Sequence, residues 1–172
     1  MQQRLIDEWD GLPTTRFARH HDHKFSEEMK NRLRHIIESK FGITLSDPQE
    51  ERKNPQEADN RISEAFALVK DWLRKNDKEA FWQIHNIDYG FYRNLWGSGG
   101  LWISLNIVFL VVSVMLYYNT LSLAFLYLIL FNVIVNITTI MIITFYLPKA
   151  TKFSAEQYAE SAWIAFYNLS RE

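Results

Sequence analysis

The sequence GLWISLNIVFLVVSVMLYYNTLSLAFLYLILFNVIVNITTIMIITFYLP, from Gly100 to Pro148, decides the fold of this chain. It belongs to an uncharged stretch that begins at Asn94 and is about 55 residues long. A helix needs roughly 20 apolar residues to cross a hydrocarbon core of about 30 Å. The stretch is therefore long enough for two crossings, and the rest of a 172-residue chain is too short to bury it as a soluble core.

Two membrane spans are predicted, over about residues 100–118 and 121–147, within a segment 98–148. Trp102 at one end of the first span and tyrosines at the other suit the two membrane interfaces. Only Asn119-Thr120 is left between the spans, so they are expected to form a tight antiparallel hairpin. Pro148, followed closely by two lysines, is expected to end the second helix.

The charges that flank the spans predict their orientation. Arg93 precedes the first span, and Lys149 and Lys152 follow the second, whereas the connection carries no basic residue. The positive-inside rule therefore predicts a multi-pass protein with both termini in the cytoplasm. The acidic, polar N-terminus lacks the apolar core of a secretory signal peptide.

The composition of the whole chain excludes several partners. Its 19 Lys or Arg and 20 Asp or Glu give a net charge of -1 and a pI near 6.5. Such a balance offers no basic face for nucleic acid. The chain has no cysteine, so disulfides and thiolate metal ligands are excluded. No motif indicates a cofactor, so none is expected.

Residues 1–97 are predicted to form a cytoplasmic helical module, because apolar residues recur there at helical spacing. Ser26 is expected to cap one helix that ends at Gly42. Asn54 and Pro55 indicate the start of another. A polar link over 46–53 is expected between the two helices. Leu5, Ile6 and Trp9 are expected to add apolar cover from a short first helix.

Two segments border the hairpin. Residues 81–96, FWQIHNIDYGFYRNLW, mix aromatic with polar side chains and are predicted to lie at the headgroup level. Residues 149–172 are predicted to form a short, amphipathic, cytoplasmic helix that Ser154 and Gln157 begin as a capping box. The predicted fold class is thus an all-α membrane protein with a helical module, a two-helix hairpin and a C-terminal helix.

A few polar side chains interrupt the spans. Asn132, Asn136 and Thr139 share one face of the second span, and Asn106 and Ser113 share a face of the first. They are expected either to hydrogen-bond within the hairpin or between copies, or to face an uncharged lumen in an assembly of hairpins. Because the spans carry no ionisable acid, base or histidine, proton relays and coupled transport are not expected.

One loop suggests a ligand. Arginines and histidines gather near two threonines, and such groups could hold a phosphate from a lipid headgroup or a nucleotide. The candidate anion-binding residues are Thr14, Thr15, Arg16, Arg19, His20 and His21. A metal site is not expected, because neither these histidines nor His35 and His85 follow a metal-binding spacing. No catalytic motif is present, so an enzyme is the poorer hypothesis.

Three groups of residues, in this order before two spans, resemble a family of small bacterial two-span membrane proteins. They are Leu12-Pro-Thr-Thr-Arg16; Asn54-Pro55 with Ala58-Asp59; and Tyr89-Gly-Phe91 with Arg93-Asn-Leu95 and Gly97. Tyr92 stands where a second basic residue would fit that pattern. The resemblance implies a bacterial inner-membrane location, and its motifs carry no known chemistry.

The function expected from these features is non-enzymatic. Cytoplasmic helices would sense a protein partner or a nucleotide signal, and the hairpins would form a homo-oligomer that perturbs or permeabilises the lipid bilayer, as two-span effectors of bacterial antiviral defence or toxin systems do. One alternative is a membrane anchor or accessory subunit of a larger complex. A second is an enzyme that acts on lipid headgroups at the histidine-arginine loop.

Overall fold

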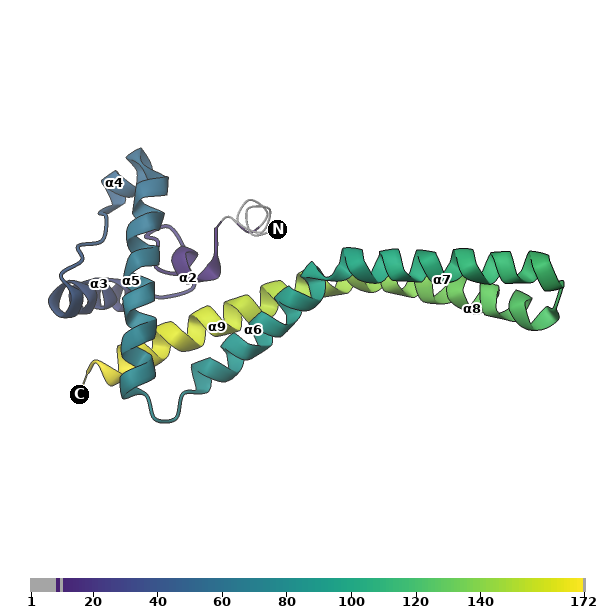
Figure 1. The fold of residues 1–172 in the computed structure, drawn as a ribbon. Helices are drawn as coiled ribbons and strands as arrows, with labels where there is room; N and C mark the ends of the chain where they lie inside the picture. Colours follow the sequence, from purple (N-terminus) through teal and green to yellow (C-terminus); the bar gives the residue numbers. More distant parts are fainter. Residues whose placement is uncertain (1–8, 10, 172) are drawn as a thin grey trace. The chain divides into compact units, whose positions relative to one another are not determined.

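The structure is a computed structural model that describes residue 9 and residues 11–171. All of its regular elements are helical (Figure 1). They are α2 (Pro13–Arg16), α3 (Glu27–Phe41), α4 (Pro48–Lys53), α5 (Pro55–Asn76), α6 (Phe81–Gly97), α7 (Gly99–Thr120), α8 (Leu123–Met141), the π-helical turn η1 (Ile142–Tyr146) and α9 (Leu147–Leu169). The predicted all-α class is confirmed.

The chain divides into two compact units. Unit 1 combines residues up to 89 with residues from 153 onward, and unit 2 is Gly90–Lys152. Helices α6 and α9 therefore contribute residues to both units. The boundaries predicted at residues 97 and 148 were placed where the apolar stretch begins and ends. The two units are instead defined by which residues pack together.

The predicted boundaries of α3 and α5 are confirmed. The Ser26 hydroxyl accepts a hydrogen bond from the Met29 N–H at 3.2 Å, and Gly42 ends α3 with a left-handed φ of 69°. Such a φ suits glycine because it has no Cβ. The Asn54 side chain accepts from the Glu57 N–H at 3.3 Å, and Pro55 is the first residue of α5.

The polar link predicted over 46–53 is wrong, because most of it forms helix α4. The Asp47 side chain accepts hydrogen bonds from the N–H groups of Gln49 at 2.7 Å and Glu50 at 2.8 Å. The Glu50 carboxylate in turn accepts from the Asp47 N–H at 3.4 Å, which completes a capping box. Pro48 at the first helical position needs no hydrogen-bond partner.

Unit 1 has one hydrophobic core to which its helices contribute. The buried faces of α3 and α5 are the predicted ones and include Leu33, Ile37, Ile62 and Val69. The C-terminal part of α9 supplies the bulk of the rest, with Trp163 and Phe166 fully buried. The first predicted helix lies outside the described residues except for Trp9, which is buried.

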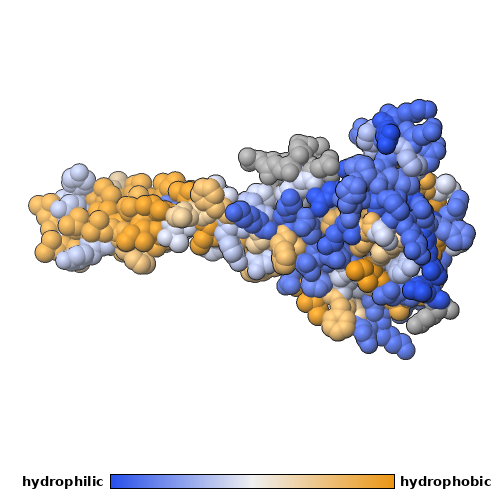
Figure 2. Space-filling view, turned by 180° about the vertical axis from the view of Figure 1, so that it is seen from behind, coloured by the Kyte–Doolittle hydropathy of each residue, from blue (hydrophilic) through white to orange (hydrophobic). Residues whose placement is uncertain are grey.

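In unit 2, α7 and α8 pack side by side (Figure 1). Both are long and apolar enough to cross a membrane. Only 11% of the apolar window in the first and 0% in the second is buried inside the structure, so neither is covered by the rest of the chain as a core helix would be. Figure 2 shows their hydrophobic surface, while hydrophilic residues dominate the surface of unit 1.

The hairpin reverses two residues later than predicted. Asn119 and Thr120 remain helical, and the turn lies at Leu121 and Ser122. The Thr120 hydroxyl donates to the Leu116 carbonyl at 2.8 Å, and the Leu121 N–H donates to the Tyr117 carbonyl at 2.7 Å. These bonds extend α7 by half a turn. Leu121 then adopts a left-handed φ of 52°, and the Ser122 side chain caps α8.

The helix break predicted at Pro148 does not occur. Helix α8 continues through η1 into α9, so Ser154 begins no separate helix. A proline lacks an N–H and its ring crowds the preceding turn of a helix. The wider π turn, in which the Leu147 N–H bonds the Ile142 carbonyl, lies directly before the proline and relieves this crowding.

The segment 81–96 forms most of α6 and is not uniformly exposed. Trp82, at 1% exposed, belongs to the core of unit 1, where Tyr89 also packs against the ring of Tyr158. Trp82 therefore lies inside unit 1 and not on its surface. Ile84 and Ile87 on the opposite face are exposed. A helix has 3.6 residues per turn, so Trp82 and the two isoleucines lie on different faces of α6. The prediction considered only the aromatic content of the segment and did not separate these faces.

Candidate functional site

The polar side chains of the spans meet along the seam between α7 and α8. The Asn106 amide nitrogen donates to the Thr139 hydroxyl at 3.1 Å, and the Asn132 amide nitrogen donates to the Ser113 hydroxyl at 3.2 Å. The Asn136 amide nitrogen approaches the Asn106 backbone carbonyl at 3.5 Å. The structure thus brings all five predicted intramembrane residues together in one hairpin.

These bonds leave part of each amide unused. The two asparagines of α8 also donate to carbonyls one turn earlier, those of Leu128 and Asn132, each at 2.9 Å. Only the nitrogen donates in every case, and within residues 11–171 no donor reaches the side-chain oxygens of Asn106, Asn132 or Asn136. Hydrocarbon around such an oxygen would offer it no hydrogen-bond donor.

At the opposite end of the hairpin from its turn, the two helices approach closely. A Cβ on Gly99 would lie 2.9 Å from Cγ2 of Ile143, which is inside van der Waals contact. Glycine therefore lets the first turn of α7 pack directly on η1. This contact between Gly99 and η1 holds the two helices together at the end of the hairpin away from its turn.

The candidate anion-binding arginines are held by carboxylates in unit 1. Arg16 donates from Nη2 to Glu156 Oε1 at 2.9 Å, and its Nε lies 3.3 Å from Asp22 Oδ2. Arg19 is 8% exposed and meets Asp59 with two nitrogens, Nε at 2.8 Å and Nη2 at 2.6 Å. Two parallel N–H to oxygen bonds of this kind are among the stronger polar contacts in proteins.

The other four residues of that candidate set also have internal partners. The Thr15 hydroxyl donates to the Leu12 carbonyl at 2.8 Å, and the Thr14 carbonyl accepts from the Trp163 indole at 3.0 Å. The His20 N–H lies 3.1 Å from both carboxylate oxygens of Glu51, and His21 Nδ1 lies 2.9 Å from one of them. These contacts fasten the loop to α4, α5 and α9.

A buried polar cluster beneath this loop was not predicted. Lys30 is fully buried, and its ammonium group donates to the carbonyls of His20 and Asp22 and to Glu27 Oε1. Arg34 donates to the carbonyls of Ser46 at 2.7 Å and Ala18 at 2.9 Å. Burial lowers the pKa of the Arg34 guanidinium. Helical spacing could have placed Lys30 on the inner face of α3, one residue after Met29.

Lowering the pH through about 6.5 is expected to destabilise unit 1 through His20. Burial is the main reason that the His20 pKa lies below its usual value of 6.5; nearby Arg34 lowers it further, while Glu51 and Glu27 oppose the shift. Between the two pKa values the unfolded chain is protonated at His20 and the folded chain is not. The stability that neutral His20 contributes is therefore complete above pH 6.5 and is lost as the pH falls towards the folded pKa.

Thermal unfolding of the wild type and His20→Gln between pH 8 and 5 would measure this effect. The variant is expected to lose less stability on acidification, because glutamine does not titrate. Parallel curves for the two proteins would contradict the role of His20.

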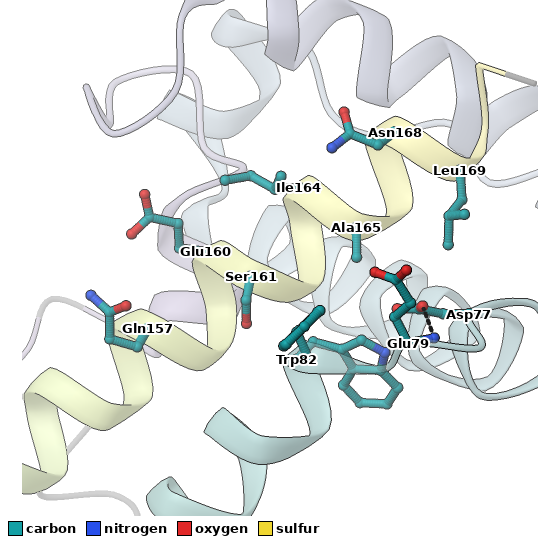
Figure 3. Close-up of a pocket in the computed structure, with 11 residues that line it drawn as sticks. Asp77, Glu79, Trp82, Gln157, Glu160, Ser161, Ile164, Ala165, Asn168 and Leu169 are labelled. Atoms are coloured by element: carbon teal, nitrogen blue, oxygen red, sulfur yellow. Dashed lines mark hydrogen bonds between the residues drawn. The ribbon is translucent and has the colours of Figure 1, made fainter.

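A groove lies on unit 1 beside the start of α6 (Figure 3). Its volume is about 490 Å³. One wall is a single face of α9, and the other is the turn between α5 and α6. The lining residues are Asp77, Glu79, Phe81, Trp82, Gln157, Glu160, Ser161, Ile164, Ala165, Asn168 and Leu169. No signal in the sequence indicated this groove, because its two walls are more than seventy residues apart along the chain.

The described residues hold no group of three or more His, Asp or Glu side chains that could bind a metal ion. No protein-family model, curated protein or solved structure matches the chain.

Proposed function

We propose that this protein is a non-enzymatic effector of the bacterial inner membrane whose hairpins assemble and perturb or permeabilise the bilayer, under the control of unit 1. The observation that supports assembly is the set of three asparagine side-chain oxygens that lack a donor within the described hairpin. In lipid, the donors available to them are another copy of the hairpin or water in a shared lumen.

The division of the chain supports placing both termini on one side of the membrane. Residues from before and after the hairpin share the hydrophobic core of unit 1. A bilayer cannot pass through such a core, so the hairpin enters and leaves from the same side. Arg93, Lys149 and Lys152 next to the spans favour the cytoplasmic side.

The proposal is tested by replacing the seam amides. Expression of the wild type is expected to depolarise bacterial cells, as a voltage-sensitive dye would report. Asn132→Leu combined with Asn136→Leu is expected to abolish the depolarisation without preventing insertion. The matched control replaces two exposed apolar residues of the same helix, Val133→Leu with Ile137→Leu, and should still depolarise. Normal growth and potential at strong wild-type expression would contradict the proposal.

An anchor or accessory subunit is the second candidate, and a specific observation favours it. Every amide nitrogen of the seam has at least one acceptor within one hairpin, and those of Asn132 and Asn136 have two, so a single copy already engages these donors. If the hairpin is only an anchor, its replacement by an unrelated two-span hairpin should preserve function. Loss of function on that exchange would argue against the anchor.

A further inference from the structure

The groove beside α6 contains a buried donor without an acceptor. Trp82 is 1% exposed, and its indole Nε1 has no hydrogen-bond partner in the part of the chain that the structure describes. In Figure 3 this nitrogen is turned towards Asp77 and Glu79 at one end of the groove. Buried polar groups in folded proteins nearly always have a partner, so the unmet indole N–H indicates that something else approaches this end.

The mouth of the groove is apolar. Phe81 at the start of α6 is 65% exposed and Ile164 on α9 is 38% exposed, and Ala165 and Leu169 of α9 also line the groove. Exposed aromatic and branched side chains around a cavity are typical of surfaces that bind another chain. The groove thus offers apolar contact area as well as the indole donor.

The charged side chains that line the groove all have the same sign. Asp77, Glu79 and Glu160 are acidic, and no Lys or Arg is among the lining residues. Glu160 is paired with Lys24 at 2.7 Å, and Asp77 accepts from the N–H groups of Glu79 and Ala80 in the turn. Neutral N–H groups leave the Asp77 carboxylate charged, so Asp77 and Glu79 together give this end of the groove its negative charge.

The shape of the groove selects the form of the partner. Its long wall consists of Gln157, Ser161, Ile164 and Asn168, which recur at intervals of three and four residues on α9. A stripe with this spacing on one helix is the surface into which the side chains of a second helix pack. An extended strand would find no free backbone edge along this wall.

We propose that this groove binds a basic amphipathic helix of a partner protein. The apolar side chains of that helix pack between Phe81 and Ile164, a lysine or arginine lies against Glu79, and a side-chain oxygen accepts from Trp82 Nε1. The inference rests on the proposed function, in which unit 1 controls the hairpins, and it names the site on unit 1 and the class of ligand that would bind there. Binding is measured without a membrane potential, so this inference and the proposed function can fail separately.

The test uses the full chain in nanodiscs of zwitterionic lipid and two synthetic 14-residue helical peptides. Both carry leucines at positions i, i+3, i+4 and i+7; one has lysines at its polar positions and the other has glutamates. Calorimetric titration, corrected for empty nanodiscs, is expected to show the lysine peptide binding at least about tenfold more tightly. Equal affinities for the two peptides, or no binding of the lysine peptide at millimolar concentration, would overturn the proposal.

Three variants locate the binding. Glu79→Lys is expected to weaken the lysine peptide about tenfold, and Trp82→Phe, which removes only the indole donor, about threefold. Glu64→Lys makes the same charge change at an exposed position of α5 that does not line the groove, and should bind as the wild type does. Circular dichroism checks that each variant is folded. If Glu79→Lys binds as tightly as the wild type, the groove is not the site.

A second copy of the chain is the competing occupant. Because the sequence has no cysteine, Ile164→Cys introduces one defined thiol at the rim of the groove. Mild oxidation without peptide should leave this variant monomeric on a denaturing gel. Efficient disulfide dimers would mean that the groove joins copies of this chain, and the proposal would be overturned.

Discussion

Trp163→Ala is expected to lower the free energy of unfolding of unit 1 by about 3 to 5 kcal/mol. Trp163 is fully buried, and its ring lies 5.1 Å from that of Phe66. Alanine would leave a cavity at the junction of α5 and α9. It would also remove the indole donor at 3.0 Å from the carbonyl of the half-buried Thr14, which would lose this hydrogen bond.

Guanidinium unfolding of the full chain in mild detergent, followed by near-ultraviolet circular dichroism, would measure this loss. The neighbouring substitution Ile164→Ala is the control, because Ile164 lies on the same turn of α9 but is 38% exposed. It should change the stability by only about 0.5 kcal/mol. Similar losses for the two variants would show that the described core does not stabilise unit 1.

Glu51→Leu is expected to cost about 3 to 5 kcal/mol, which is typical of breaking a buried ionic contact by removing one partner. Its side chain is only 6% exposed and meets the His20 N–H, His21 Nδ1 and, at 3.9 Å, Arg34. Leucine would leave those donors without an acceptor and Arg34 without its nearest carboxylate. The loop that carries His20 and His21, here called the histidine loop, should then detach from α4.

The same unfolding measurement would test Glu51. Glu51→Gln keeps the shape and can still accept hydrogen bonds, so it is expected to lose less stability than Glu51→Leu. Glu64→Gln, at an exposed position of α5, should be neutral within about 0.5 kcal/mol. A stable Glu51→Leu protein whose histidine loop resists proteolysis as the wild type does would contradict this role.

The helical elements were predictable where a local rule decides them. Ser26, Gly42 and Asn54 define helix ends through bonds to their own neighbours, and the apolar face of α5 follows from its period. Helix α4 was missed because its residues are nearly all polar, and it forms through the capping box of Asp47 and Glu50. Its only buried residue, Glu51, is buried by its contacts with the histidine loop.

The break predicted at Pro148 was wrong, and the partners of the arginines near the histidines were not predicted; both depend on features that the local sequence does not contain. A proline signals a break only when the preceding turn is α-helical, and η1 is not. Clustered cations such as Arg16 and Arg19 indicate an anion site, but carboxylates that lie near them in the fold compete for the same donors. Glu156 and Asp59, which hold these arginines, are about 140 and 40 residues away along the sequence. No local pattern contains these two contacts; only Asp22, which also lies near Arg16, is close to it in the sequence.

The shared core of unit 1 imposes an order of events on synthesis. The ribosome makes Phe66 and Ile62 before the hairpin, but the side chains of α9 that share their core, including Trp163 and Phe166, are made after it. The early segment must therefore wait, with its apolar face uncovered, until translation has passed through the whole hairpin. A nascent chain that stalls before residue 153 would keep that face open to chaperones and proteases, so unit 1 can close only after α9 has been made.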